Sequence, residues 1–227
     1  MADDEEVQYK AEYVDVPEGE ESQVTNWLPR PGKAKVTYAN GSTYEGTFDA
    51  ERMKNGDGIF TWMQAAEEDG EEATMLAKYE GAYVDGKKAG IGKMTFPNQD
   101  TYTGEWSNNL MEGEGTYVYK ASGDAYSGTW VKGKKEGQGS YQFGADDSIM
   151  QGTWENGSIT SGTWRFSDGT VYSGSFKDGK PTGQGVYVFP SGITQKGEYV
   201  AKPLGEGEEE EGAPPKMEWL GQPVEAC

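Results

Sequence analysis

The residue types that most often carry chemistry in proteins are scarce in this chain. It contains no histidine, and its single cysteine is Cys227. Histidine-based triads, cysteine–histidine nucleophiles and the usual zinc sites are therefore excluded. Acidic residues are abundant, but no pattern places two of them in a cleft where one carboxyl group would be desolvated. We predict that the chain is not an enzyme and has no catalytic, cofactor-binding or metal-binding residues.

Three segments read G-x-x-x-x-G-K, the beginning of a phosphate-binding loop: residues 81–87, 128–134 and 174–180. A serine or threonine should follow the lysine, and the loop should join a strand to a helix. Lys88, Lys135 and Pro181 follow instead, and each segment lies within a predicted hairpin. We therefore attribute the pattern to the internal repeat described below and predict no nucleotide site.

Lysines collect at the same predicted turns, along what should be one rim of a sheet. They are Lys87, Lys88, Lys132, Lys134, Lys135, Lys177 and Lys180. Such a strip could attract anionic lipid head groups, but we favour the simpler interpretation that these lysines keep the turns soluble. The acidic ends of the chain would repel both lipids and nucleic acids. Membrane binding is thus the less favoured interpretation, and nucleic-acid binding is not expected.

Aromatic residues and glycines recur with a period of about 24 residues, which indicates one stacked supersecondary unit. The first position of the repeat falls at Tyr44, Tyr79, Tyr102, Tyr126, Met150, Tyr172 and Gln195. Within a repeat the aromatic residues and glycines are two apart, as on one face of a strand. Dipeptides such as Asp85-Gly86 and Asp178-Gly179 favour tight hairpin turns between the two strands of a repeat.

These patterns predict an all-β fold, an elongated single-layer antiparallel β-meander built from about six to seven hairpin repeats. One face would carry rings that lie over glycines, and the opposite face would carry polar side chains. An exposed ring face of this size would mark a protein interface, although such rings also hold a sheet together. The candidate partner-binding residues at its centre are Trp106, Tyr117, Trp130, Tyr141, Trp154 and Phe176.

The pattern Tyr-x-Gly-x-Trp-x-x-Gly-x-x-x-Gly-x-Gly-x-Tyr, as in residues 126–141, resembles the membrane occupation and recognition nexus (MORN) repeat. The resemblance covers residues 32–199 and implies an array of antiparallel hairpins. Two positions depart from it, because Met150 and Gln195 replace the first tyrosine of their repeats. We expect the sheet to bend or bulge there.

The charge pattern divides the chain into an acidic N-terminal arm (1–31), the repeat array (32–200, with an acidic insertion at 63–78) and an acidic C-terminal tail (201–227). Most of the net charge of −19 belongs to the arm, the insertion and the tail. The arm could add a strand to a sheet edge. In the tail, Met217, Trp219 and Leu220 form a candidate docking segment that would bind the ring face or a partner.

A short chain of repeats with acidic ends resembles the small MORN-repeat proteins of the radial spoke head in motile cilia and flagella. The resemblance implies a non-catalytic scaffold that packs with other radial spoke head proteins, in a head facing the central-pair apparatus. The expected location is the cytoplasm and cytoskeleton, in the axoneme. Two alternatives stay open: a module that binds anionic phospholipid membranes, and a non-catalytic part of an enzyme assembly. Open edge strands at the first and last repeats also leave a homodimer open.

Overall fold

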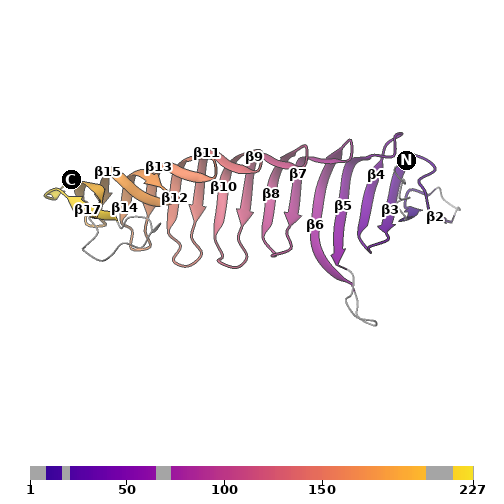
Figure 1. Ribbon diagram of the computed structural model, residues 1–227, viewed down its shortest axis with the longest axis horizontal. Coiled ribbons are helices and arrows are strands. Elements are labelled where there is room, and N and C mark those ends of the chain that lie inside the picture. The colour runs from indigo at the N-terminus through magenta and orange to yellow at the C-terminus, as the bar shows by residue number, and fades with distance from the viewer. Residues whose placement is uncertain (1–8, 17–20, 65–72, 203–216, 227) are drawn as a thin grey trace. The chain divides into compact units, whose positions relative to one another are not determined.

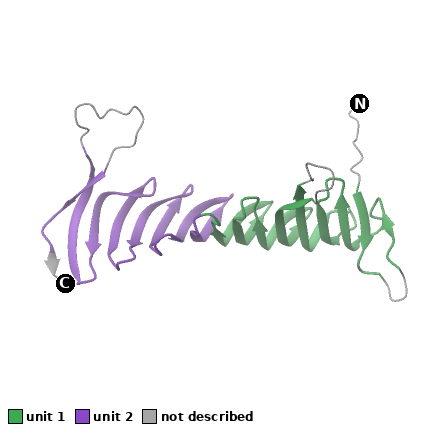
Figure 2. Ribbon diagram, turned by 90° about the horizontal axis from the view of Figure 1, so that it is seen from below, with its two compact units in different colours: residues 1–121 green, residues 122–227 purple. Residues whose placement is uncertain are grey.

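The computed structural model describes residues 9–16, 21–64, 73–202 and 217–226. These residues form strands and turns and contain no helix, which confirms the predicted all-β fold (Figure 1). The chain divides into two units, residues 1–121 and 122–227 (Figure 2). Each unit is a sheet of consecutive antiparallel hairpins. Cys227 and most of the acidic runs lie outside the described residues.

The first unit contains strands β1 to β9. They are β1 (Tyr9–Tyr13), β2 (Val24–Thr25), β3 (Gly32–Tyr38), β4 (Thr43–Phe48), β5 (Lys54–Gln64), β6 (Thr74–Val84), β7 (Lys87–Thr95), β8 (Thr101–Ser107) and β9 (Leu110–Val118). From β3 to β9 each strand pairs with the next one along the chain. β1 pairs with β3 on one side and with β2 on the other. Part of the N-terminal arm is therefore paired to the first hairpin.

The second unit contains strands β10 to β18. They are β10 (Ala125–Val131), β11 (Lys134–Gln142), β12 (Ile149–Glu155), β13 (Ser158–Arg165), β14 (Val171–Lys177), β15 (Lys180–Val188), β16 (Ile193–Ala201), β17 (Met217–Gly221) and β18 (Glu225–Ala226). Consecutive strands pair from β10 to β17, and β18 pairs with the other end of β16.

Two-residue turns join the strands of several hairpins, as the dipeptides predicted. At Asp85-Gly86 the φ angles are 48° and 74°, and at Asp178-Gly179 they are 51° and 72°. Positive φ at both central residues matches the right-handed twist of the flanking strands. The local sequence thus determines where each hairpin reverses.

The first tyrosine of five repeats forms the core of its hairpin. The five side chains, Tyr44, Tyr79, Tyr102, Tyr126 and Tyr172, are fully buried. Each ring lies over two facing glycines, so a Cβ on either glycine would overlap the ring or the facing strand. Tyr126, for example, covers Gly128 and Gly139, and its hydroxyl donates a hydrogen bond to the carbonyl oxygen of Thr129 at 3.2 Å. Aromatic cover of bare strand backbone was predicted from the sequence.

The two glycines of each G-x-G pair have different roles, which the sequence analysis did not distinguish. Gly139 lies beneath Tyr126, but Gly137 has a φ of 64° and sits where the register between β10 and β11 shifts. A side chain at positive φ is strained, and an extra residue on one strand makes a β-bulge. The first glycine therefore permits the backbone conformation of the bulge, and the second leaves room for the buried tyrosine ring.

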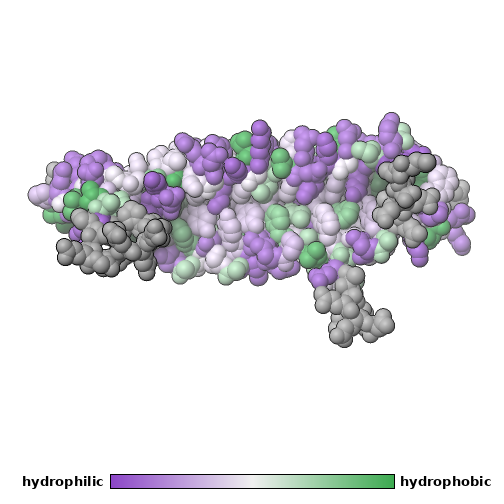
Figure 3. All heavy atoms as spheres, in the orientation of Figure 1, coloured by the Kyte–Doolittle hydropathy of each residue, from purple (hydrophilic) through white to green (hydrophobic). Residues whose placement is uncertain are grey.

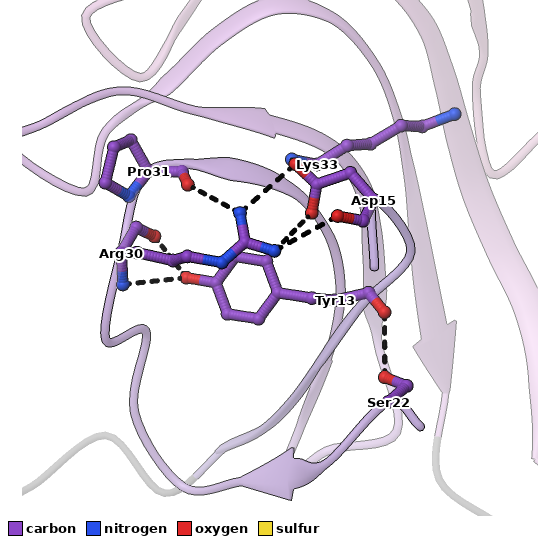
Figure 4. Close-up of polar contacts among 6 residues, drawn as sticks. All are labelled: Tyr13, Asp15, Ser22, Arg30, Pro31 and Lys33. Atoms are coloured by element: carbon purple, nitrogen blue, oxygen red, sulfur yellow. Dashed lines mark hydrogen bonds and ion pairs between the residues drawn. The ribbon is translucent and has the colours of Figure 1, made fainter. Parts of the chain in front are cut away.

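Polar contacts attach the segment before β3 to the first unit (Figure 4). The guanidinium group of Arg30 lies 4.2 Å from the centre of the Tyr13 ring and 2.9 Å from an Asp15 carboxylate oxygen. The Tyr13 hydroxyl donates to the Arg30 carbonyl oxygen, and its oxygen accepts from the Arg30 backbone N–H. The hydrogen bond from Arg30 lowers the pKa of the Asp15 carboxyl group. Arg30 is thereby held against Tyr13 and Asp15, at the end of β1.

Candidate functional site

The predicted ring face exists, but most of its central residues are buried within their own unit. Trp106, Trp130, Trp154 and Phe176 are only 4–6% exposed. Tyr117 and Tyr141 are half-buried. The large rings pack edge to face with the first tyrosines; the centroids of Tyr102 and Trp106 are 5.2 Å apart with an interplanar angle of 88°. These contacts hold the sheet together, and the role of the six residues in partner binding stays a prediction.

Half-buried rings are the part of this face that a partner could reach. In the second unit, Phe143 stacks on Trp164 at 5.7 Å, and Trp164 lies 4.6 Å from Phe166. Phe166 stacks on Tyr187 at 6.4 Å, and Tyr187 stacks on Phe189 at 6.1 Å. These five rings lie in a row at the ends of the second strands of three successive hairpins, β11, β13 and β15. The sequence signal for it was the aromatic-x-aromatic ending of each repeat.

The predicted rim of lysines is divided between the two faces of the sheet. Lys88 and Lys135 lie on the ring face; the Lys88 ammonium is 4.5 Å from the centre of the Trp106 ring, and that of Lys135 is 4.7 Å from Tyr141. Their neighbours Lys87 and Lys134 donate to the side-chain oxygens of Asn108 and Asn156, each at 3.4 Å. Successive side chains on a strand point to opposite faces, so a run of adjacent lysines cannot make one strip. Lys177 and Lys180 are exposed at strand ends, and Lys132 lies in a turn.

Sequence reasoning missed a third lysine among the rings, Lys54. Its ammonium lies 4.1 Å from the centre of the Phe60 ring and 4.9 Å from that of Tyr44. Burial lowers the pKa of Lys54 and of Lys135 to about 8, and it lowers the pKa of Lys88 as well. The strand register explains this position, because each of these three lysines faces the last aromatic residue of the first strand of its hairpin. Aromatic faces attract cations, so the lysines occupy the space between rings as part of the core.

Two aspartates that precede a first tyrosine tie neighbouring turns together. Asp124 accepts a hydrogen bond from the Tyr141 hydroxyl at 2.6 Å and from the Gly144 backbone N–H at 2.8 Å. Asp100 accepts from the Tyr117 hydroxyl and the Lys120 N–H, both at 2.8 Å. The Tyr141 hydrogen bond is the main cause of the lowered pKa of Asp124. Burial opposes the change at Asp100, but the hydrogen bonds prevail and its pKa is also lowered.

The C-terminal docking segment lies on its own sheet in this structure. Trp219 of β17 faces Tyr199 of β16, and the centre of its ring is 5.0 Å from that of Tyr187. The Trp219 indole N–H donates to the Gln195 side-chain oxygen at 3.0 Å. Met217 is half-buried, and Leu220 is 54% exposed on the opposite face. Of the three residues, Trp219 is thus the anchor.

The face opposite the rings differs in chemistry between the two units. In the first unit one cross-strand row reads Glu45, Ile59, Glu80, Lys93, Thr103 and Thr116. The corresponding row in the second unit reads Ser127, Ser140, Gln151, Thr163, Ser173, Val186 and Lys196. Figure 3 shows hydrophobic residues dispersed among hydrophilic ones on the side of the molecule that it presents. The second row is uncharged from Ser127 to Val186 and carries a charge only at its last residue, Lys196. The first row carries charge at Glu45, Glu80 and Lys93 and includes the exposed Ile59.

The family model of the MORN repeat matches residues 79–101, 102–123, 126–147 and 172–194. The chain contains MORN repeats. The hairpins that begin at Tyr44 and Met150 have the same strand pairing but are not among the matched segments. A search of curated proteins found no match.

Two further properties bear on function. Across the described residues there is no helix with the length and apolar character needed to cross a membrane. Within the same residues, no group of three or more metal-ligating side chains is arranged to hold an ion.

Proposed function

We propose that this chain is a non-catalytic structural scaffold, a subunit of the axonemal radial spoke head that supports ciliary and flagellar motility. The observation that carries the proposal is that every described strand belongs to a sheet of antiparallel hairpins, four of which match MORN repeats. The aromatic, lysine and aspartate side chains of these hairpins are engaged with one another. The sheet faces and edges are therefore what the chain offers to other proteins.

The finer assignment rests on the resemblance of a short, acidic repeat chain to small spoke head proteins of the kind numbered radial spoke protein 10. Its partners would be other radial spoke head proteins, in a head that faces the central pair. The uncharged row from Ser127 to Ser173 suits packing against a partner, because neutral hydroxyl and amide groups cost less to desolvate than charges. The charged row of the first unit would then face water or a basic partner.

The placement of the lysines favours a scaffold over a module for anionic membranes. Lys54, Lys88 and Lys135 lie between rings, where their charge is directed at aromatic faces. Lysines contribute to membrane attraction when they stand together near the lipid surface. Sedimentation with vesicles that contain anionic lipid tests this point, and we expect no binding at physiological salt.

Affinity purification of the tagged protein from cells with motile cilia tests the main proposal. We expect spoke head subunits to be recovered under salt that preserves axonemal complexes. The variant Thr163→Arg places a charge in the uncharged row and should reduce that recovery, whereas Ser191→Arg, in an exposed turn, should not. Recovery of membrane proteins or of a catalytic chain, without axonemal components, would overturn the proposal.

A further inference from the structure

The last hairpin of the second unit is built from segments that are distant in the sequence. β16 ends at Ala201, and β17 begins at Met217. The two strands nevertheless pair over five residues, from Gly197 facing Gly221 to Ala201 facing Met217. Elsewhere in this unit the two strands of a hairpin are joined directly, as by Asp178-Gly179 between β14 and β15. β17 therefore pairs with a strand from which it is separated by residues 202–216 of the sequence.

The site on β16 that pairs with β17 fits a tryptophan and, two residues later, a glycine. Gln195 stands where other repeats have their buried tyrosine, so no tyrosine of β16 covers Gly197. Trp219 covers it instead, and a Cβ on Gly197 would overlap the indole ring. Gly221 faces Gly197, which reproduces the facing glycines of the other hairpins. The incoming strand therefore supplies both the ring and the second glycine that the repeat lacks.

Specific contacts fix the incoming strand. The Trp219 ring lies 5.1 Å from Tyr199 and 6.3 Å from Tyr172, in addition to its contact with Tyr187. The Gln195 side chain accepts from the indole N–H and donates to the Gln222 carbonyl oxygen at 3.1 Å. The Gln222 backbone N–H donates to the Lys196 carbonyl oxygen at 2.8 Å. A strand of this sequence makes the same contacts whichever copy of the chain it comes from.

The composition of residues 202–216 weakens the preference for the strand of the same chain. This segment contains Glu206, Glu208, Glu209, Glu210 and Glu211 together with three prolines. A connection of this length provides an effective concentration on the order of millimolar for the segment that it joins to the sheet. Repulsion among five glutamates that are close in the sequence opposes that advantage. Exchange of identical elements between copies is a low-cost route to a dimer.

We propose that the edge of β16 is a strand-acceptor site that binds Met217–Gln222 of a second copy of this chain, in reciprocal exchange. The acceptor consists of described residues: the paired edge 197–201 and the side chains of Tyr172, Tyr187, Gln195 and Tyr199. The inference does not depend on the proposed function, because it concerns pairing between copies in any assembly that brings them close together.

A mixing experiment with single cysteines tests the exchange directly. Val200 faces Glu218 across β16 and β17, and directly opposed residues of antiparallel strands lie within reach of a disulfide. In a Cys227→Ser background, one copy carries Val200→Cys and the other, with a tag of different size, carries Glu218→Cys. We expect a disulfide-linked heterodimer whose yield rises as protein concentration increases toward about 1 mM.

Three controls make the result decisive. A single chain with both Val200→Cys and Glu218→Cys should form its disulfide and shows that the two positions can be linked. Val200→Cys mixed with Leu220→Cys should give little product, because Leu220 faces Glu198. Adding Trp219→Ala to the Glu218→Cys copy should abolish the product. If the double variant links within one chain but the mixed copies never link up to about 1 mM, the proposal is wrong.

Deletion of residues 203–216 gives an independent measurement. Lys202 alone then joins Ala201 to Met217, and a hairpin needs at least about two residues to reverse the chain. β17 can no longer pair with β16 of its own copy. We expect a dimer by light scattering, which Trp219→Ala should convert to a monomer. A monomeric deletion variant that retains the other hairpins would overturn the proposal.

Discussion

Two adjacent hairpins of the second unit solve the same packing problem with different residues. In β10–β11, Tyr126 covers two glycines, Lys135 lies among rings and Asp124 ties the turn to Tyr141. In β12–β13, Met150, Ile159 and Ser148 occupy the corresponding positions. All three replacements are buried, with exposures of 1–3%.

The comparison separates what the repeat requires from what it tolerates. Both hairpins keep a glycine pair, Gly128 with Gly139 and Gly152 with Gly162. The backbone strands approach so closely there that a Cβ would overlap the facing backbone. The core residue, the lysine and the aspartate can each be exchanged. The second hairpin has lost one interaction in the process, because the buried indole N–H of Trp164 has no hydrogen-bond acceptor among the described residues.

The largest expected effect comes from filling the space beneath Tyr126. Gly139→Val would force the valine into the tyrosine ring, and overpacking with backbone displacement should destabilise the fold by about 3 kcal/mol or more. Urea unfolding monitored by tryptophan fluorescence measures the loss. Ser140→Ala, one residue away on the opposite face, is the control and should change stability by less than about 0.5 kcal/mol. A loss below about 1 kcal/mol for Gly139→Val would show that close approach at the glycine pair is not required.

Removing the charge of Asp124 from the β10–β11 hairpin should have the next largest effect on stability. Asp124→Asn weakens two hydrogen bonds to a charged acceptor and should cost about 1–3 kcal/mol at pH 7. The folded-state pKa of Asp124 is lowered, so the carboxylate stabilises the fold above its unfolded pKa near 4 and loses this effect as pH falls through the folded value. The difference between wild type and variant should therefore shrink as pH falls below the unfolded pKa and disappear once the carboxyl group of the folded protein is protonated. A difference that is independent of pH would contradict the role of the charge.

Replacing Lys135 by the isoleucine of the neighbouring hairpin should change stability at pH 7 by no more than about 1 kcal/mol, because apolar burial replaces a cation–π contact. The pH dependence distinguishes the two residues. With a folded pKa of about 8, below the unfolded value near 10.4, Lys135 makes the wild type more stable as pH rises from 8 to 10.

Lys135→Ile should reduce that rise without abolishing it, since the pKa values of Lys54 and Lys88 are also lowered. The pH range in which stability rises ends near pH 10. Above that pH, buried tyrosines such as Tyr79, whose pKa is raised to about 12, lower the stability of the fold. Thermal melts of both proteins between pH 7 and 10 make the measurement. An unchanged slope in the variant would mean that Lys135 is not desolvated.

The smallest expected effect is a gain in the second hairpin. Ser148→Asp places a carboxylate at the position of Asp124, where it can accept from the unpartnered indole N–H of Trp164. We expect an increase in stability of about 1 kcal/mol at pH 7 that is lost below pH 4. Ser148→Asn is the matched neutral control. A loss of stability with Ser148→Asp would show that Trp164 cannot turn its N–H to this position.

The repeat could be predicted from the sequence because its signals are local. The spacing of Tyr126, Gly128 and Trp130 indicates a strand, and Asp178-Gly179 indicates a tight turn, whatever the surroundings. Aromatic cover of glycine also followed, since rings and glycines share one face. The candidate ring face was predicted in outline, but the sequence did not show that Trp106 and Trp154 would be buried by packing against neighbouring tyrosines.

The sequence by itself determined the strands, the turns, the position of the glycine pairs and the absence of histidine chemistry, because each depends on residue type or on neighbours along the chain. The tertiary structure decided which lysines lie among rings, which aspartates accept from distant tyrosines, and that Trp219 completes the hairpin begun by β16. Those contacts depend on cross-strand register. A β-bulge between two strands shifts which side chains oppose each other, and the closing pair of segments is separated by residues 202–216, whose length carries no information about where Trp219 docks.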